Sequence, residues 1–368
     1  MNKQTNVIVL GAGIVGLSAA RRLAELGATV IVLDSSSPGG QGSRAAAGVA
    51  VPSLRILDDP VMLDFVTAAK TTLAADLETL SIRNNSLYRG EGILRIATDS
   101  KIQNSLEAAA VHHPGWLGRW ISADQIVELE PALAGTALLG GFLDETARIV
   151  DADAYITALL HDAHNHGVDL RIGEGAIQVC EDKDKVRVIT YRGSLSSDWL
   201  LVAAGAWSGS IAGLPSLPIR PLRGQMLTLM HPQVSVSRIV SGAGGYLAPW
   251  RCGEVVVGAT EEEAGFANHT TPIGLFYLTS VVARLAPALR QARLTQSWAG
   301  LRSVSPNGRV ALGRYPGTNR VLLATGHSGQ GILAGALSGE IMSELIDQGT
   351  SPIAEAFDPS TVLGVRLE

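Results

Sequence analysis

The feature that most constrains the fold is a glycine-rich segment close to the start of the chain. Gly11, Gly13 and Gly16 follow a short β-branched run at residues 6–10 and precede a helical pattern of apolar residues. A second apolar run, at residues 28–33, follows that pattern and ends at Asp34. A strand, a glycine turn, a helix, a second strand and an acidic residue in this order predict a parallel βαβ unit that binds a dinucleotide.

Each glycine has a separate physical role in such a unit. Gly11 allows the tight turn, Gly13 lets a pyrophosphate approach the backbone, and Gly16 lets the helix pack closely on the strand. The N-terminus of the helix presents free N–H groups to the phosphates. Asp34 can accept hydrogen bonds from both ribose hydroxyls. The alternative is a glycine-rich turn in which Asp34 merely begins the next loop.

The composition sets limits on the class of protein. The 368 residues suffice for two or three domains, with 46% hydrophobic and 17% charged residues. The net charge of −5 is spread along the chain, so we expect no nucleic-acid partner. Cys180 and Cys252 form no metal or redox motif, and we expect no metal. With no membrane-spanning apolar stretch and no signal-peptide pattern in residues 1–5, we expect a cytoplasmic protein.

The rest of the chain indicates two kinds of domain. Apolar runs at residues 199–205 and 320–326 each end in glycine, and the second leads into a helix at 332–346. Short β-forming segments lie between them, at residues 224–231, 237–241, 245–249 and 253–259. We therefore expect an α/β Rossmann-type domain interrupted by an antiparallel-sheet (α+β) substrate domain. The predicted boundaries are 1–85, 145–215 and 305–368 for the first, and 86–144 and 216–304 for the second.

Several smaller elements can also be predicted. Residues 60–79 have the pattern of an amphipathic helix, and residues 88–97 resemble two strands around Gly92. A helix should end at residues 129–131, and Asp151 or Asp153 should cap the next one. The small residues at 39–48 fit either a helix that offers its N–H groups to a ligand or a flexible loop.

Ten separated segments carry a family resemblance. The chain resembles the FAD-dependent amino-acid and amine oxidases of the D-amino-acid oxidase superfamily, and within it the glycine oxidases. The segments lie in the expected order over nearly the whole length. They are residues 7–16, 44–48, 129–131, 202–208, 221–225, 246–249, 256–260, 298–302, 305–308 and 325–329.

The resemblance implies an FAD cofactor. The binding should be noncovalent, because the cysteine that attaches flavin in monomeric sarcosine oxidase has no counterpart here. The helix that follows residue 331 would direct its N-terminus at the flavin and stabilise negative charge there. The residues implied around the cofactor are Gly11, Gly13, Ile14, Val15, Gly16, Asp34, Ser43, Arg44, Ala46, Ala47, Gly48, Gly205, Trp207, Gly326, His327, Ser328, Gly329, Gln330, Gly331 and Ile332.

The resemblance also implies a substrate and a reaction. Arg302 matches the family's carboxylate-binding arginine, and Tyr246 matches a tyrosine that assists it. A guanidinium fork suits a carboxylate, although a surface salt bridge and a packed strand tyrosine are the alternatives. The implied reaction is oxidative deamination of a small amino acid or amine. A hydride passes from Cα to flavin N5, the imine is hydrolysed, and O₂ is reduced to H₂O₂. No acid or base is assigned, since His327 could equally position the backbone.

Four features depart from the glycine oxidases. Arg44 stands where a small hydroxyl residue is expected, and residues 328–331 replace an Arg-Asn-Gly loop. Glu261 begins an acidic triplet where an apolar residue is expected, and Arg55 lies near the substrate entrance. One hypothesis is that Arg55 and Glu261 recognise a larger, polar amino acid or amine. The alternative is that both are solvated surface charges.

Other functions remain compatible with the sequence. The chain could be a dehydrogenase for sarcosine, D-proline or another secondary amine that passes electrons to a quinone or a protein. It could also be the FAD-binding subunit of a heteromeric oxidase. A nicotinamide-dependent dehydrogenase is a more distant alternative. The expected partners are therefore a small amine substrate and O₂ or another electron acceptor, and a homo-oligomer is compatible with the sequence.

Overall fold

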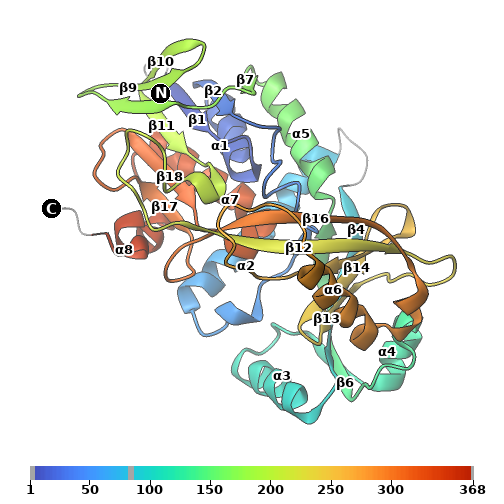
Figure 1. The fold of residues 1–368 in the computed structure, drawn as a ribbon. Helices are drawn as coiled ribbons and strands as arrows, with labels where there is room; N and C mark the ends of the chain where they lie inside the picture. Colours follow the sequence, from blue (N-terminus) through green and yellow to red (C-terminus); the bar gives the residue numbers. More distant parts are fainter. Residues whose placement is uncertain (1–4, 82–86, 366–368) are drawn as a thin grey trace.

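The computed structural model describes residues 5–81 and 87–365. Two large sheets organise these residues, one in each half of the molecule (Figure 1). Residues 1–4, on which part of the signal-peptide prediction depends, lie outside the described part. Among the helices of the described part, not one combines the length and apolarity needed to cross a membrane.

The six-stranded sheet contains the predicted βαβ unit. Its order is β17-β18-β11-β1-β2-β7, and all its pairs are parallel except β17 with β18. Parallel strands buried on both faces need continuous apolar sequence, which explains the unbroken runs in β1 and β18. The strands are β1 (Asn6–Leu10), β2 (Thr29–Asp34), β7 (Asp169–Ile172), β11 (Trp199–Val202), β17 (Ala311–Arg314) and β18 (Val321–Thr325).

Different layers cover the two faces of this sheet. Helices α1, α2, α5 and α7 pack on one face, where the largest apolar core lies. A three-stranded sheet of order β10-β9-β8, together with α8, covers the other face. The elements are α1 (Ile14–Glu25), α2 (Pro60–Ser81), α5 (Ala152–Asn165), α7 (Gly331–Asp347), α8 (Pro359–Leu363), β8 (Gln178–Glu181), β9 (Val186–Thr190) and β10 (Gly193–Ser197).

The nine-stranded sheet forms the second half. Its order is β16-β12-β15-β14-β13-β4-β6-β3, with β5 paired to β6. Helix α6 packs on one face of this sheet, against β12, β14 and β15, whereas α3 and α4 lie beside β4 and β6 (Figure 1). The elements are β3 (Val49–Ala50), β4 (Tyr88–Ala97), α3 (Ser100–His112), β5 (Arg119–Ile121), α4 (Ala123–Leu129), β6 (Gly140–Val150), β12 (Arg220–Met230), β13 (Ile239–Gly242), β14 (Gly245–Pro249), β15 (Val255–Gly258), α6 (Pro272–Leu285) and β16 (Arg293–Val304).

One prediction about this second sheet was confirmed in part and one was wrong. The segments predicted to be antiparallel, which form β12, β13, β14 and β15, do pair antiparallel, but the sheet as a whole is mixed because β13 also pairs with β4 in parallel. These two strands are distant in the chain, so no hairpin turn forces them to be antiparallel. Residues 88–97 form one strand instead of two. The positive φ of Gly92 accommodates an irregularity in the register with β6 rather than a reversal of the chain.

The other local predictions had mixed outcomes. The helices expected at 60–79 and 332–346 are α2 and α7, and Asp151 caps α5 through the N–H of Ala154. Residues 39–48 form successive turns instead of a helix. They are tied to β16 by a hydrogen bond from the Leu301 N–H to the Gln41 carbonyl. The domain boundaries stay a prediction, and β6 runs across the one placed at residue 145.

Candidate functional site

One continuous cavity lies between the two sheets. Its volume is about 1930 Å³, roughly twice the upper end of ordinary small-molecule pockets. Five of the segments that line it are residues 10–15, 33–36, 39–48, 203–207 and 326–332, although Ala12 and Arg44 within them do not line it. Every residue predicted to contact the cofactor lines this cavity except Gly16 and Arg44. The fold thus brings segments from both ends of the chain to one place.

The three motif glycines have distinct environments. A Cβ on Gly11, whose φ is +109°, would overlap the carbonyl of Ala203, and a Cβ on Gly16 would overlap the carbonyl of Gly11. A Cβ on Gly13 would meet only the Ser43 hydroxyl, at 3.3 Å. Gly11 and Gly16 are therefore required by the fold itself, whereas Gly13 keeps the cavity wall open. Gly16 is absent from the wall because it packs α1 against β1.

The N-terminus of α1 faces the cavity without a side-chain cap of its own. Instead, the Ile14 N–H donates to the Ser43 hydroxyl over 3.1 Å. Asp34 stands at the end of β2, where one carboxylate oxygen accepts from the Ala12 N–H and the other from the backbone N–H and hydroxyl of Ser36. These bonds fix the Asp34 carboxylate at the edge of the cavity, in the position predicted for a ribose ligand.

The N-terminus of α7 also faces the cavity. Gln330, its N-cap residue, provides no side-chain cap, and its Oε1 is buried without a hydrogen-bond partner among the described residues. A Cβ on Gly329 would meet no atom within 4 Å, so this loop borders open space. His327 is buried and its Nε2 lies 2.8 Å from the Ser338 hydroxyl. Burial lowers the pKa of His327 to about 4, so its ring is neutral near pH 7.

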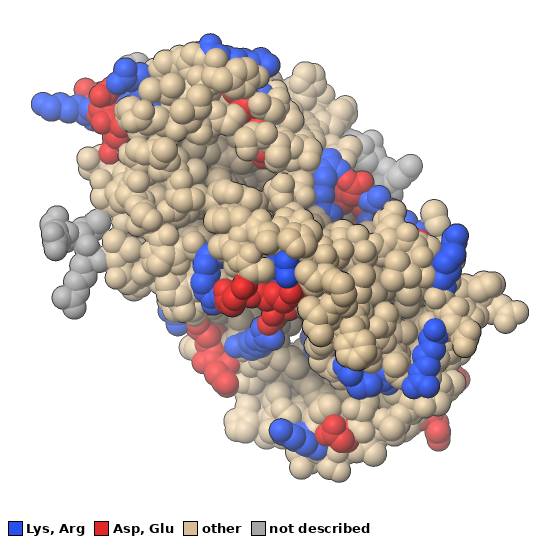
Figure 2. All heavy atoms as spheres, in the orientation of Figure 1, with Lys and Arg blue, Asp and Glu red and all other residues tan. Residues whose placement is uncertain are grey.

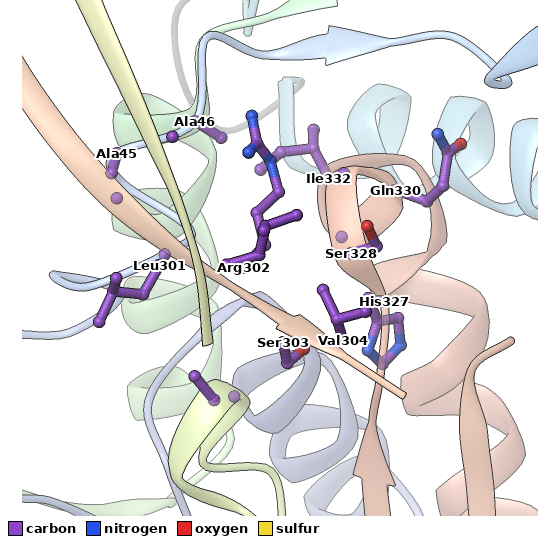
Figure 3. Close-up of a pocket in the computed structure, with 18 of the residues that line it drawn as sticks. Ala45, Ala46, Leu301, Arg302, Ser303, Val304, His327, Ser328, Gln330 and Ile332 are labelled. Carbon is purple, nitrogen blue, oxygen red and sulfur yellow. The ribbon is translucent and has the colours of Figure 1, made fainter. Parts of the chain in front are cut away.

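Arg302 extends from β16 into the cavity, in the space between Ala46 and Ile332 (Figure 3). Its guanidinium lies across Gly224 of β12, where a Cβ would be only 2.7 Å from Nη1 and Nη2. Nη1 donates to the Thr260 carbonyl over 3.1 Å. No described carboxylate forms an ion pair with this side chain. Arg302 is therefore held by backbone contacts, with its charge free to bind an anion.

Tyr246 of β14 lines the same cavity as Arg302 of β16, and β12 and β15 lie between these two strands. Its ring packs directly over Gly258, where any Cβ would overlap it, and its hydroxyl is 3.9 Å from the sulfur of Met226. Burial raises the pKa of Tyr246 to about 12, although the charge of Arg302 acts in the opposite direction. The phenol is therefore protonated near pH 7 and can donate a hydrogen bond into the cavity.

The acidic triplet at 261–263 is neutralised residue by residue. Glu261 pairs with Arg55 at 2.8 Å, Glu262 with Arg223 at 2.6 Å, and Glu263 with Arg220. Arg55 and Glu261 both line the cavity and are 75% and 44% exposed, so their ion pair lies at its solvent side. Charges of both signs also lie close together beside the hollows of the face drawn in Figure 2.

Arg44 turns away from the cavity. It pairs with Asp153, and its other nitrogens donate to the Pro38 carbonyl and the Thr157 hydroxyl. These contacts tie the loop at 39–48 to α5. The structure therefore does not bring the Arg44 side chain to the predicted cofactor site, because an acidic residue on α5 holds it elsewhere.

Several lining residues were missed by the sequence analysis. Gln41 and Ala45 lie in the small-residue loop, and the Ala45 carbonyl accepts from the indole N–H of Trp298 over 2.9 Å. Arg95 and Ser241 line the other side of the cavity. The sequence did indicate that Arg95 is unusual, because this charged residue interrupts the apolar residues of β4. No feature of the sequence indicated Ser241.

The cavity wall fits FAD chemically. Two helix N-termini whose N-cap residues give no side-chain cap offer N–H groups for the phosphates and the flavin, and Asp34 offers an acceptor for a ribose. The unpartnered Oε1 of Gln330 and the open space beside Gly329 indicate that the loop at 326–332 faces a ligand. The residues that would hold FAD are therefore the predicted ones that line the cavity, which leaves out Gly16 and the side chain of Arg44.

Comparison with known proteins agrees with this geometry. The family model described as FAD dependent oxidoreductase (DAO) matches residues 6–345. The chain therefore belongs to the DAO family of FAD-dependent oxidoreductases, which makes it an enzyme that uses FAD.

Individual relatives match over nearly their whole length. The chain is 28% identical to glycine oxidase of Bacillus licheniformis over 352 residues, covering 94% of each protein. Its fold is similar to glycine oxidase from Bacillus cereus ATCC 14579, with a TM-score of 0.87, 23% identity and coverage of 99% and 100%. It is also similar to iminodiacetate oxidase from Chelativorans sp. BNC1, with a TM-score of 0.84, 25% identity and coverage of 96% and 98%.

Proposed function

We propose that this enzyme oxidises the C–N bond of a small amino acid or a related carboxylate-bearing amine. The observation that carries the proposal is Arg302, a cation without an ion-pair partner among the described residues. It projects into the cavity whose lining segments at residues 10–15, 33–36, 39–48, 203–207 and 326–332 would hold FAD. We call these segments the dinucleotide cradle. The similarity to glycine oxidase and iminodiacetate oxidase, whose names both denote amine substrates with a carboxylate, supports this assignment.

The residues of the chain bind and orient the substrate. The Arg302 fork would hold the substrate carboxylate, and the protonated Tyr246 hydroxyl would donate to it. The backbone N–H groups at the starts of α1 and α7, with Asp34, would hold FAD noncovalently, and FAD would supply the acceptor for the Cα hydride and the route by which two electrons reach O₂ to give H₂O₂. The nitrogen lone pair forms the C=N bond of the imine, and water then hydrolyses the imine. His327 is neutral and bonded to Ser338, so we assign it a positioning role.

The site residues lie within one chain, which supports a self-sufficient enzyme over an FAD-binding subunit. Cys180 and Cys252 do not line the cavity, which supports noncovalent binding. A dehydrogenase would use the same residues to hold FAD, so the formation of H₂O₂ in air distinguishes it from an oxidase.

The test is anaerobic mixing of the purified yellow protein with glycine, sarcosine, other D- and L-amino acids and simple amines. We expect at least one carboxylate-bearing amine to bleach the flavin, and we expect stoichiometric H₂O₂ when air is admitted. Bleaching without peroxide in air would favour the dehydrogenase. A flavin that no amine bleaches would contradict the proposed function.

A further inference from the structure

The cavity contains a second arginine that the proposed reaction leaves unused. Arg95 lies in the middle of β4, is only 5% exposed, and lines the cavity. Its neighbours in the strand, Ile93, Leu94, Ile96 and Ala97, are all apolar and buried. A cation in such surroundings is costly to bury, so it normally has a partner.

The described residues do not provide that partner. Nη1 of Arg95 is buried without a hydrogen bond. Burial lowers the pKa of the guanidinium, and the charge of Asp144 only partly offsets this effect. Asp144 forms no ion pair with Arg95, and one of its oxygens accepts instead from the backbone N–H and hydroxyl of Thr146, at 2.8 and 2.6 Å. An arginine that served only to neutralise Asp144 would pair with it directly.

The register of the sheet places Arg95 on the substrate side of the cavity. Arg95 of β4 is opposite Ser241 of β13, Ser241 is opposite Tyr246 of β14, and Tyr246 is opposite Gly258 of β15. Directly paired residues point to the same face of a sheet, so Arg95 and Tyr246 share the cavity face. One strand separates β4 from β14, so their backbones are about 10 Å apart at this level.

Arg302 occupies the other end of this face. Its guanidinium lies over Gly224 of β12, beyond Tyr246 as seen from Arg95. Two arginines without ion-pair partners among the described residues therefore flank the tyrosine, both lining one cavity. A ligand that satisfied both would carry an anionic group at each end.

We propose that Arg95 binds a second carboxylate of the substrate, so that the preferred substrate is an amine with two carboxylates, one on Arg302 and one on Arg95. This inference rests on the proposed amine oxidation and deepens it by naming the substrate class. Ser241, which lies between Arg95 and Tyr246, offers a hydroxyl to the same end of the ligand. Arg95 is thus a specificity-determining residue, whereas Arg302 serves every carboxylate substrate.

The first experiment measures binding and needs no turnover. The holoprotein is titrated with inert acids, namely glutarate against the monocarboxylate valerate, with succinate and adipate to vary the length. The readouts are the shift of the flavin absorption spectrum and the rise in Tm. We expect the best dicarboxylate to bind at least ten-fold more tightly than valerate. In Arg95→Met this preference should vanish, while valerate binding should stay within two-fold.

The second experiment compares substrates. The ratio of kcat/KM for iminodiacetate, aspartate or glutamate to that for sarcosine or glycine should fall at least ten-fold in Arg95→Met for the best dicarboxylate. The values for sarcosine and glycine should change little. Arg119→Met is the matched control, because Arg119 is an exposed arginine on β5 that does not line the cavity. Its ratio should equal that of the wild type.

A second variant keeps the test informative if Arg95→Met does not fold. If Arg95→Met is unstable because Asp144 loses its counter-charge, Arg95→Met/Asp144→Asn removes both charges and keeps the oxygen that Thr146 contacts. It should fold, bind FAD and show the same loss of dicarboxylate preference. Equal binding of glutarate and valerate by the wild type, or an unchanged preference in these variants, would overturn the inference. Failure of every amine to bleach the flavin would instead overturn the proposed function, while the inert-acid titration would still test Arg95.

Discussion

The two walls of the cavity are built in different ways. On the six-stranded sheet, the wall consists largely of backbone, with glycines, helix N-termini and a fixed carboxylate at Asp34. On the nine-stranded sheet, the wall consists of side chains that stand on one face, chiefly Arg302, Tyr246 and Arg95. The first arrangement suits a ligand that never changes. The second can alter its specificity one side chain at a time while the cradle stays intact.

The substitution Arg302→Met is the strongest test of whether the two walls act independently. The variant cannot form the charge-assisted bidentate bond to the substrate carboxylate, so kcat/KM for amino acids should fall by a factor of about 100 to 1000, or about 3–4 kcal/mol. FAD affinity should be unchanged, because Arg302 belongs to the other wall. Steady-state kinetics and flavin titration of the apoprotein measure the two quantities. Loss of FAD together with activity would show that the walls are not independent.

Two alanine substitutions in the backbone wall distinguish a glycine that the fold requires from a glycine that faces the ligand. Gly16→Ala would force a Cβ into the Gly11 carbonyl, and we expect the apoprotein to lose about 3 kcal/mol of unfolding free energy. Gly13→Ala meets only the Ser43 hydroxyl, so the apoprotein should lose about 1 kcal/mol or less. Its FAD affinity should nevertheless fall at least ten-fold.

Denaturant unfolding of both apoproteins and FAD titration provide the comparison. Equal loss of stability in the two variants would refute the separation of a structural glycine from a ligand-facing one.

We expect His327, which lies on the FAD-facing wall, to make the folding stability of the protein decrease at acidic pH. Its pKa is about 4 in the folded protein against 6.5 for an ordinary histidine, because burial disfavours the charged ring. Between pH 6.5 and 4 the unfolded chain takes up a proton that the folded chain does not. Folding stability is therefore complete above pH 6.5 and declines as the pH falls through this range, by at most about 3 kcal/mol.

The measurement is the unfolding free energy of wild type and His327→Gln between pH 7 and 4. The variant should have the shallower slope. Parallel pH profiles would show that His327 is not the group responsible.

The smallest effect is expected at the solvent side of the substrate wall. Arg55 and Glu261 neutralise each other in an exposed pair, so Arg55→Ala should change unfolding free energy by less than about 1 kcal/mol. We expect kcat/KM for glycine or sarcosine to stay within three-fold. A selective loss for larger polar amines would support the hypothesis that the pair contributes to substrate recognition. No change across the whole panel would end that hypothesis.

The same contrast explains what the sequence could predict. The backbone wall is encoded locally, since Gly11, Gly13, Gly16 and Asp34 lie within one βαβ unit whose spacing favours a dinucleotide-binding geometry over a simple glycine-rich turn. Its remaining segments follow apolar strands that end in glycine. These features specify a dinucleotide cradle before any tertiary contact is known.

The side-chain wall depends on pairings between distant strands. The parallel pairing of β4 with β13 places Arg95 near Tyr246, and no local pattern predicts it. The direction of the Arg44 side chain depends on its ion pair with Asp153 of a distant helix. The charge of Glu261 is neutralised by Arg55, which is also distant in the chain. Sequence and resemblance could therefore propose Arg302 and Tyr246 as substrate ligands, whereas the geometry of the sheet was needed to propose Arg95.

The central claim is that the two walls hold one amine between a carboxylate-binding arginine and the flavin. The most direct test is the anaerobic rate of flavin bleaching by the best amino-acid substrate and by its amide, in wild type and in Arg302→Met. We predict rapid bleaching by the acid, a rate at least 100-fold lower for the amide, and little difference between the two in the variant. Equal bleaching by acid and amide in the wild type would contradict the account.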